Sequence, residues 1–266
     1  MGRICMCHAV LYQDIEVVAI NELVTKFRSI PVHGNFKGDV HAGKDGKLHI
    51  NNKPIHVFSK IKPEDINWGS VGADYIIASS VVPKKVIITA ISDAPTFVCG
   101  VNLDTYKPEY TIISSASSTI NCIAPIAKLV HDKFSIEEVF MSSIRAVDVT
   151  DNKSVANNII PTYTEVAEVV RMIIPSLDDK FTDLEFRIPV VNASVIDLVV
   201  KLKRTTTYHA ITAAMKEAEE GPLKGTLSFM VLDRSFKLVT YYANDWAYLK
   251  RVCDLLVYVA KKDVER

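Results

Sequence analysis

The feature that most constrains the fold is a series of short apolar runs, rich in β-branched residues, that turn signals separate. In the first half of the chain such runs cover residues 15–20, 55–58, 75–79, 86–90 and 110–114. Runs of this kind are typical of buried, mostly parallel strands. Loops between them are marked by Asp45-Gly46, Lys62-Pro63 and Trp68-Gly69. The first half is therefore predicted to be an α/β domain.

The second half begins with a change of period. From residue 117 to residue 134 the apolar positions are spaced for one face of a helix, which Ser117 or Ser118 can cap. Further on, the patterns predict strands at 138–146, 184–189 and 195–202, and helices at 208–219 and 246–261. With 266 residues and 48% hydrophobic content, the chain is long enough for two ordinary domains. An α/β first half joined to an α+β second half is the expected architecture.

The charge balance favours no class of charged partner. Lysine plus arginine equals aspartate plus glutamate at 31 each, so no overall field attracts nucleic acid or an acidic membrane. No window is apolar for long enough to span a bilayer, and Met6 stands where a myristoylation signal needs Ser or Thr. The expected location is the cytoplasm.

The cysteines predict neither a disulfide framework nor a metal site. Five of them are scattered through a sizeable chain, so reduced thiols are expected. Cys5, Cys7 and His8 could begin a zinc site, but no second Cys/His cluster supplies the remaining ligands. The predicted metal is none.

Several longer strings identify a resemblance that covers nearly the whole chain. In order and wording they resemble the glyceraldehyde-3-phosphate dehydrogenase family, and strings kept in order from end to end are far more specific than one short motif. They include Val17-Val18-Ala19-Ile20-Asn21, His33-Gly34-Asn35-Phe36-Lys37-Gly38, Phe97-Val98-Cys99-Gly100-Val101-Asn102, Phe186-Arg187-Ile188-Pro189, Glu220-Gly221-Pro222-Leu223-Lys224-Gly225 and Arg251-Val252-Cys253-Asp254-Leu255-Leu256.

The resemblance implies a domain order and a reaction. It implies a Rossmann-like NAD-binding domain over residues 1–116, here without its first strand, and a catalytic domain over 117–245 with a mixed or antiparallel sheet. A closing helix over 246–266 would pack back on the NAD-binding domain. The family reaction is the NAD-dependent oxidative phosphorylation of glyceraldehyde 3-phosphate in glycolysis. The implied partner is a further copy of the chain, because the catalytic sheet forms tetramer contacts in the family.

The motif that carries the family's nucleophile is altered in this chain. Ser-Asn-Ala-Ser-Cys-Thr-Thr-Asn-Cys reads here Ser114-Ser115-Ala116-Ser117-Ser118-Thr119-Ile120-Asn121-Cys122. Ser118 thus replaces the catalytic cysteine, and Arg145 replaces the histidine that serves as base. A guanidinium stays protonated and accepts no proton. Because nucleophile and base act as one unit, the resemblance predicts a catalytically impaired or inactive member, a pseudoenzyme.

Three further expectations concern Ser118, Arg145 and the neighbouring Cys122. Ser118 is expected to cap the helix, and Arg145 to pair with Asp148. Cys122 lies one helical turn beyond Ser118 and is not expected to replace the nucleophile.

The phosphate-binding positions are kept in part. Ser117, Thr119 and Arg187 match family residues that hold substrate or inorganic phosphate, and a helix that starts near Ser117 is a natural anion site. The family's Thr-Gly phosphate pair reads Thr164-Glu165, and Asp148 stands where the family has a threonine. Both changes add a negative charge that opposes phosphate.

The cofactor motif is damaged as well. The chain begins inside the family's glycine-rich turn, at Gly2-Arg3-Ile4, and the last glycine of that turn is Cys5. Glu22 stands where the family has an aspartate for the adenosine ribose, and Asn244 matches the asparagine that orients the nicotinamide. NAD is therefore the implied cofactor, at a weakened site.

Segments are also missing by comparison with the family. One gap follows Ser80-Val81-Val82, one lies between Lys153 and Ala156, and a longer one between Met230 and Phe236 removes strands of the catalytic sheet. The alternatives to a pseudoenzyme are a residual NAD-dependent dehydrogenase and a non-catalytic interaction protein. Nucleic-acid binding finds no support in the charge distribution.

Overall fold

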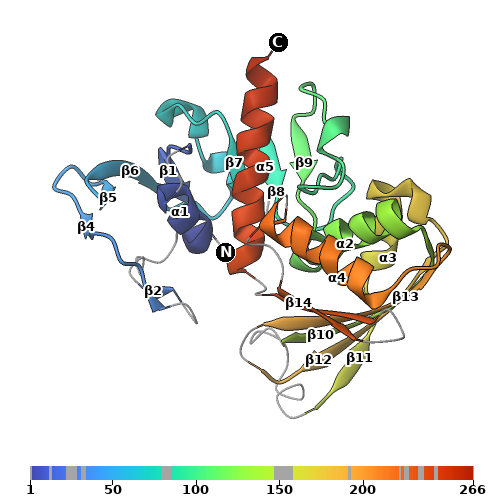
Figure 1. The fold of residues 1–266 in the computed structure, drawn as a ribbon. Helices are drawn as coiled ribbons and strands as arrows, with labels where there is room; N and C mark the ends of the chain where they lie inside the picture. The colour runs from blue at the N-terminus through green and yellow to red at the C-terminus, as the bar shows by residue number, and fades with distance from the viewer. Residues whose placement is uncertain are drawn as a thin grey trace. The chain divides into compact units, whose positions relative to one another are not determined.

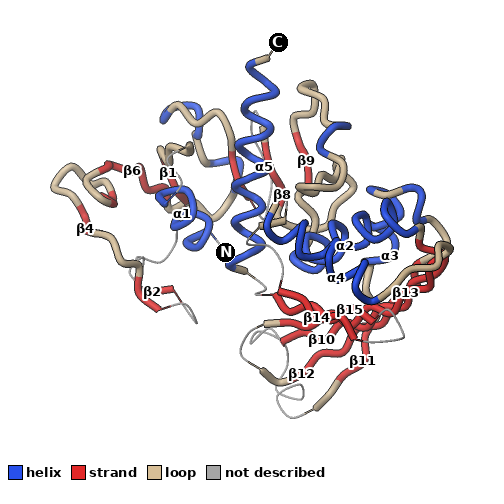
Figure 2. The backbone as a smooth tube through the Cα atoms, viewed as in Figure 1, coloured by secondary structure: helices blue, strands red, loops and turns tan. Residues whose placement is uncertain are grey.

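The structure is a computed structural model, and it describes residues 2–11, 14–21, 29–30, 34–78, 85–146, 158–190, 193–221, 223–224, 228–232, 237–242 and 245–265. The chain divides into two compact units. The first contains residues 1–96, 106–115 and 252–266, and the second contains residues 97–105 and 116–251. Figure 1 labels the elements, and Figure 2 separates helices, strands and loops by colour.

The first unit contains parallel strands in two separate sheets. One sheet has the order β1-β6-β5-β4, from β1 (Ala19–Asn21), β6 (Lys53–Phe58), β5 (Leu48–Ile50) and β4 (Val40–Ala42), with β1 and β6 parallel. The other has the order β7-β8-β9, all parallel, from β7 (Ile76–Ala78), β8 (Val86–Ile88) and β9 (Ile112–Ser114). A short pair, β2 (Ser29–Ile30) and β3 (Gly34–Asn35), is antiparallel.

The terminal strands β1 and β7 correspond to the two neighbours of the central first strand in a doubly wound sheet. In a doubly wound sheet the first strand lies between the strands that follow the first and third crossovers. In the described residues each of β1 and β7 ends a sheet. The Rossmann-like half is therefore present, with its sheet divided.

Local sequence explains the antiparallel part of this unit. Asn51 and Asn52 form the two-residue turn between β5 and β6, with φ of 49° and 66°. Type I′ hairpin turns require positive φ at both positions, and asparagine tolerates it better than most residues. The alternate buried residues Leu48, Ile50 and Ile55 then pack with Met6 in a small core.

Two helices complete the first unit. Helix α1 (Gly2–Leu11) buries six consecutive residues from Ile4 to Ala9. Helix α5 (Trp246–Val264) begins in the second unit, and its residues from Val252 onward belong to the first. Short 3-10 turns lie at Pro63–Asp65 and Trp68–Val71 in this unit.

One buried ionic cluster fastens α5 within the first unit. Asp263 accepts hydrogen bonds from Lys85 Nζ and the Tyr106 hydroxyl, both at 2.8 Å, and from the Tyr75 hydroxyl at 3.0 Å. The Lys85 and Asp263 side chains are only 12% and 18% exposed. Burial alone would raise the pKa of Asp263, but these three hydrogen bonds outweigh it and lower that pKa.

We expect Asp263→Asn to destabilise the protein by about 2 kcal/mol at neutral pH, because the buried Lys85 loses its counter-charge. A folded-state pKa below the unfolded value contributes stability above the unfolded pKa, and that contribution is lost as pH falls through the folded pKa. The difference between parent and variant should therefore shrink in acid. Urea unfolding midpoints at neutral pH and near pH 3 check this, and Glu265→Gln, which breaks an exposed pair between Lys262 of the same helix and the residue that follows the helix, is the control.

The second unit is a six-stranded mixed sheet with helices on one face. Its order is β11-β12-β10-β13-β15-β14, and only β10 and β12 are parallel neighbours. The strands are β10 (Ile136–Ala146), β11 (Ile160–Thr162), β12 (Phe181–Ile188), β13 (Ser194–Leu202), β14 (Ser228–Leu232) and β15 (Lys237–Tyr242). In Figure 1 the helices α2 (Ser118–Phe134), α3 (Val166–Ile173) and α4 (Tyr208–Glu220) lie over one side of this sheet. Short 3-10 turns lie at Leu103–Thr105 and Pro175–Leu177.

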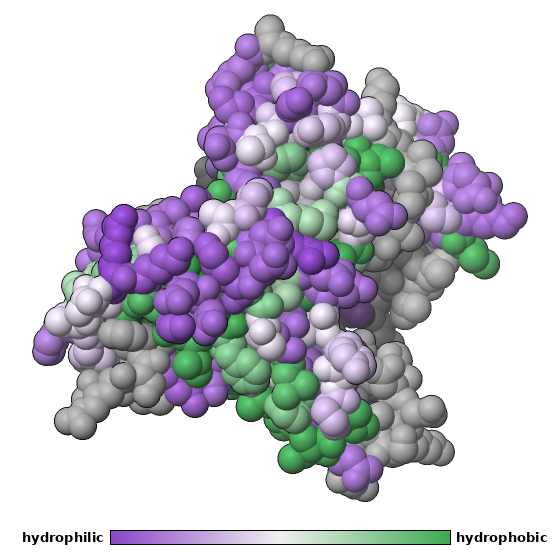
Figure 3. All heavy atoms as spheres, turned by 90° about the vertical axis from the view of Figure 1, so that its right-hand side faces the viewer, coloured by the Kyte–Doolittle hydropathy of each residue, from purple (hydrophilic) through white to green (hydrophobic). Residues whose placement is uncertain are grey.

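Alternation along the strands explains this layering. Met141, Ile196, Leu198 and Leu238 point to the helix side and join the main core with Ile123 of α2. The intervening residues point to the other face, where Phe140, Val199 and Tyr241 are exposed. Hydrophobic surface is visible in the lower part of Figure 3, the part that carries this sheet. The predicted fold class, a Rossmann-like half with an α+β half, is confirmed.

The described sheet ends in the antiparallel pair β14 and β15, which pair from Ser228↔Tyr241 to Leu232↔Lys237. These two strands flank the gap predicted between Met230 and Phe236. That the gap removes strands of the family's sheet stays a prediction.

Candidate functional site

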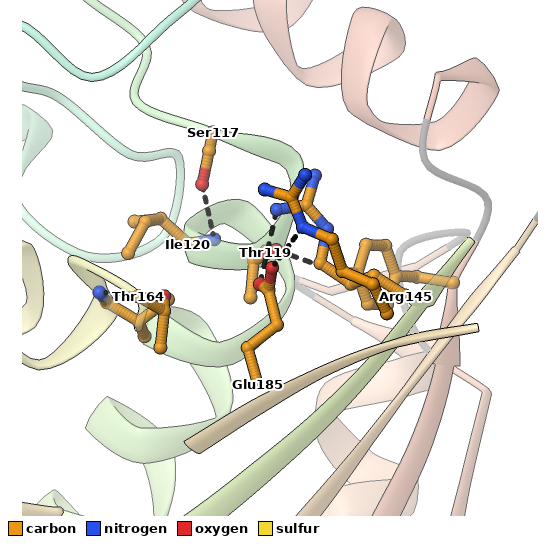
Figure 4. Close-up of polar contacts among 9 residues, drawn as sticks. Ser117, Thr119, Ile120, Arg145, Thr164 and Glu185 are labelled. Atoms are coloured by element: carbon orange, nitrogen blue, oxygen red, sulfur yellow. Dashed lines mark hydrogen bonds and ion pairs between the residues drawn. The ribbon is translucent and has the colours of Figure 1, made fainter. Parts of the chain in front are cut away.

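The candidate site lies at the start of α2, where Ser117 and not Ser118 caps the helix. Ser117 Oγ accepts a hydrogen bond from the backbone N–H of Ile120 at 3.3 Å, as Figure 4 shows. The preceding residue, Ala116, has φ of 57°, and its carbonyl accepts a hydrogen bond from the Tyr248 hydroxyl at 2.7 Å. This turn sets the direction of the helix. The expectation that Ser118 serves as the cap is wrong.

Ser118, predicted to stand at the position of the family's nucleophile, is the first residue of α2 and is half-buried. It lines a small cavity of about 10 Å³ together with Asn121, Cys122, Tyr242, Ala247, Tyr248 and Arg251. A cavity of this size holds about one water molecule. Ser118 therefore borders a narrow space within the second unit.

Arg145, predicted to stand at the position of the family's base, forms an ion pair with a buried carboxylate. Its Nη1 lies 3.3 Å from Glu185 Oε2, and Arg187 Nε lies 3.4 Å from Glu185 Oε1. The Glu185 side chain is 3% exposed, whereas Arg145 and Arg187 are 34% and 41% exposed. In Figure 4 the Glu185 carboxylate points at the Arg145 guanidinium.

Strand register explains why the two arginines share one carboxylate. Arg145 of β10 is directly opposite Arg187 of β12 in parallel pairing. Two like charges at neighbouring positions repel. Glu185 is two residues before Arg187 on the same face of the sheet, and its negative charge offsets the repulsion between the two arginines. The expected partner of Arg145, Asp148, lies outside the described residues. Sequence reasoning missed Glu185, because only the register brings it to Arg145.

Thr119, a predicted phosphate-binding residue, points into the protein. It is 1% exposed, and its Oγ1 lies 2.8 Å from the Tyr242 hydroxyl. Burial raises the pKa of Tyr242, and the hydrogen bond with Thr119 opposes that rise. The Thr119 hydroxyl is thus engaged with a neutral phenol in the core.

Thr164, another predicted phosphate residue, contributes to the start of α3. Its Oγ1 accepts a hydrogen bond from the Val166 N–H at 3.2 Å, and Asp183 Oδ2 accepts one from the Ala167 N–H at 3.1 Å. Helix N-terminal N–H groups are where an anion binds. Here the Asp183 carboxylate takes that place. Burial raises the pKa of Asp183, and the Ala167 hydrogen bond partly offsets the rise.

Cys122 is the cysteine nearest to Ser118 in sequence, and it is buried in the core. It is 4% exposed, and its Sγ lies 3.7 Å from Thr240 Oγ1. Burial raises the pKa of this thiol to about 12. Near neutral pH it carries almost no thiolate.

We expect Cys122 to resist alkylation in the folded protein. A pKa of about 12 leaves about one thiol in 10⁴ ionised at pH 8. The half-buried Cys99 should react with iodoacetamide at least about 100-fold faster. Peptide mass spectrometry over a time course measures both rates, and urea should bring the two rates together. Fast labelling of Cys122 in the folded chain would contradict this account.

The predicted cofactor residues lie in the first unit. Gly2 opens α1, and no atom lies within 4 Å of the position where a Cβ would stand. Arg3 is half-buried and Ile4 is 5% exposed. An open glycine at a helix N-terminus fits the close approach of a pyrophosphate. Glu22 and Asn244 lie outside the described residues. Among the predicted cofactor residues, the fit to NAD therefore rests on those at the start of α1.

Neither a metal-binding cluster nor a membrane-spanning helix is found within the described ranges. No group of three or more His, Cys, Asp or Glu side chains there is arranged to hold a metal ion. No described helix is both long and apolar enough to cross a membrane.

Known proteins match both halves of the chain. The NAD binding domain of glyceraldehyde 3-phosphate dehydrogenase matches residues 1–85, and the C-terminal domain of that enzyme matches residues 117–236. A glyceraldehyde-3-phosphate dehydrogenase of Phanerodontia chrysosporium is 44% identical over 323 positions, which cover 99% of this chain and 96% of that protein. The corresponding proteins of Schizophyllum commune and Glossina morsitans morsitans are 42% and 37% identical with the same coverage.

The alignment with the Phanerodontia relative is longer than this chain. Its 323 positions exceed the 266 residues of this chain, so the Phanerodontia relative has internal segments without a counterpart here. The family's cofactor is NAD. On the matches to both domains and on identity over nearly its full length, the chain belongs to the glyceraldehyde-3-phosphate dehydrogenase family.

Proposed function

We propose that this chain is a non-catalytic member of its family, one that does not oxidise glyceraldehyde 3-phosphate. The observation that carries the proposal is the ion pair of Arg145 with the buried Glu185 at the position of the family's base. A guanidinium bound to a carboxylate is protonated and has no lone pair to offer.

The chemistry of the family reaction makes this loss decisive. A thiolate adds to the aldehyde to give a hemithioacetal, whose hydroxyl loses a proton as hydride leaves for the nicotinamide. Ser118 offers a hydroxyl far less acidic than a thiol, and Arg145 can accept neither proton. Cys122 cannot replace the nucleophile, because it is buried with a pKa of about 12. Both proton transfers therefore lack a base among these residues.

The phosphate-binding residues support the same proposal. The Thr119 hydroxyl is hydrogen-bonded to the Tyr242 hydroxyl, and the Thr164 hydroxyl is hydrogen-bonded to the α3 backbone. Arg187 shares Glu185 with Arg145, which neutralises part of its charge. The Asp183 carboxylate at the start of α3 repels a phosphate placed there. The site therefore has less net positive charge for binding a doubly charged substrate or inorganic phosphate than it would have without these carboxylates.

A steady-state assay tests the proposal. Purified protein is mixed with glyceraldehyde 3-phosphate, phosphate and NAD, and NADH is followed by absorbance. We expect a turnover at least about 10⁴-fold below an ordinary enzyme value of roughly 10 s⁻¹. The Phanerodontia relative, prepared in the same way, is the positive control. Turnover by this chain within tenfold of that control overturns the proposal.

We also propose self-association through the open face of the six-stranded sheet. Phe140 and Val199 are opposite one another in the β10–β13 pairing and are 48% and 37% exposed, and Tyr241 on β15 is 58% exposed. A set of exposed apolar side chains on one sheet face favours a protein interface. Light scattering after gel filtration should give a mass above one chain, and Phe140→Glu should lower it. A monomeric parent would contradict the proposed self-association and would leave the proposed loss of catalysis unaffected.

A further inference from the structure

Two buried thiols of the first unit face each other across α1 and α5. Cys5 Sγ lies 3.7 Å from Cys253 Sγ, and Cys253 Sγ lies 3.9 Å from the Cys5 carbonyl oxygen. The two residues are 6% and 3% exposed, and 248 positions separate them in the chain. Both cysteines are reduced.

We propose that Cys5 and Cys253 form a site of reversible oxidation to an intramolecular disulfide. A disulfide has its sulfurs about 2.0 Å apart, so side-chain rotation has to bring them less than about 2 Å closer. The oxidant is a hydroperoxide, of which hydrogen peroxide is the smallest. This inference rests on the contact between α1 and α5 and does not depend on the loss of catalysis.

The chemistry proceeds in two balanced steps. The Cys5 thiolate attacks one peroxide oxygen, the O–O bond breaks, and the leaving hydroxide takes up the proton that the Cys5 thiol had released, so the products are Cys5 sulfenic acid and water. The Cys253 sulfur then attacks the sulfenic sulfur, the S–O bond breaks, and a second water leaves as the S–S bond forms. Two thiols are oxidised by two electrons, and one hydrogen peroxide is reduced to two waters.

The local environment favours Cys5 as the attacking thiol. The hydrogen bond with Cys253 lowers the pKa of Cys5, against the effect of burial. Its neighbour Cys7 on the same helix is 2% exposed, and burial raises the pKa of Cys7 to about 11. Two residues along a helix turn a side chain by about 200°, so Cys7 points away from the contact that Cys5 makes. Cys7 is therefore the matched control.

Oxidation has a mechanical consequence for α1. The bond would close one covalent ring over residues 5–253 and fix the helix that carries Gly2, Arg3 and Ile4. A cross-link over so long a loop restricts the unfolded chain strongly. The oxidised protein should unfold at a higher temperature and run faster on a non-reducing gel.

The experiment uses the full reduced chain and hydrogen peroxide. After oxidation, remaining thiols are blocked in denaturant, and tryptic peptides are analysed without reduction. We expect peptide 4–26 joined to peptide 252–261, with reversal by dithiothreitol. Cys7→Ser should form this link as the parent does, while Cys5→Ser and Cys253→Ser should not form it. In Cys253→Ser, dimedone should label the sulfenic acid at Cys5.

The same experiment can overturn the proposal even if a variant fails to fold, because the parent carries the main readout. The linked peptides should form in folded parent at least tenfold faster than in parent oxidised in urea. A parent that stays reduced, links that join Cys99 or Cys122 instead, or loss of the link in a folded Cys7→Ser would each refute it. So would oxidation of Cys5 to sulfinic acid in place of the link.

Discussion

Ser118→Cys is expected to yield no measurable NADH, although it restores the family's nucleophile. A new thiol at the first residue of α2 gains from the helix N-terminus, which stabilises a thiolate. It can therefore add to an aldehyde. The next step fails, because the hemithioacetal hydroxyl has to lose its proton as hydride leaves, and the Arg145–Glu185 pair accepts none. We expect turnover to stay at least about 10⁴-fold below the family's.

Two measurements make this result informative. The variant should react quickly with iodoacetamide at the new thiol, which shows that a nucleophile is present. Ser118→Ala gives the background of the absorbance assay. NADH formation by Ser118→Cys that clearly exceeds the Ser118→Ala background would show that another group serves as base, and the role given to Arg145 would be wrong.

Glu185→Ala is expected to be the most destabilising substitution in the candidate site. It leaves Arg145 and Arg187 directly opposite one another without the carboxylate between them. Breaking a fully buried pair costs about 3–5 kcal/mol, and partial exposure of both arginines reduces the effect to about 2 kcal/mol. With an m-value of roughly 2 kcal/mol per molar, the urea midpoint should fall by about 1 M.

A matched control separates this effect from the loss of any carboxylate. Glu138 on β10 pairs with Lys201 at 3.7 Å, and its side chain is 70% exposed. Glu138→Ala should change stability by less than about 0.5–1 kcal/mol, since exposed pairs contribute little. If Glu185→Ala proves as stable as Glu138→Ala, the carboxylate does not hold the two arginines together.

Strongly periodic segments of the fold could be predicted from the sequence. The helix expected at 117–134 is α2 (Ser118–Phe134), and the one expected at 208–219 is α4 (Tyr208–Glu220). The strand expected at 195–202 is β13 (Ser194–Leu202). In each case hydrophobic spacing and burial agree, so local sequence and packing favour the same element.

Short elements were harder to predict for a physical reason. Helix α3 (Val166–Ile173) contains three valines and an isoleucine, residues that local propensity favours for strands. Burial of Val166, Val169, Val170 and Ile173 on one helical face decides the matter. The run expected as a strand at 15–20 contributes only its end to β1 (Ala19–Asn21), where pairing with β6 begins.

The residues of the candidate site also fall into two groups, those that motif comparison could predict and those that it could not. The replacements Ser118 and Arg145 could be identified by comparison of motifs, because each stands within a matched string. Glu185, Asp183 and the Thr119–Tyr242 contact could not, because each depends on a register or a packing that brings distant residues together. The cysteine pair in α1 and α5 is of the same kind. Motif comparison predicted the changes at Ser118 and Arg145, and the structure shows which side chains those two residues lie against.

The most direct test of the proposed loss of catalysis is to trap the covalent intermediate. The protein is incubated with NAD and glyceraldehyde 3-phosphate without inorganic phosphate, so that any acyl group formed stays on the chain, and its intact mass is measured. We predict an unchanged mass, with the Phanerodontia relative acylated under the same conditions. A stoichiometric acyl adduct on Ser118 or Cys122 would contradict the account.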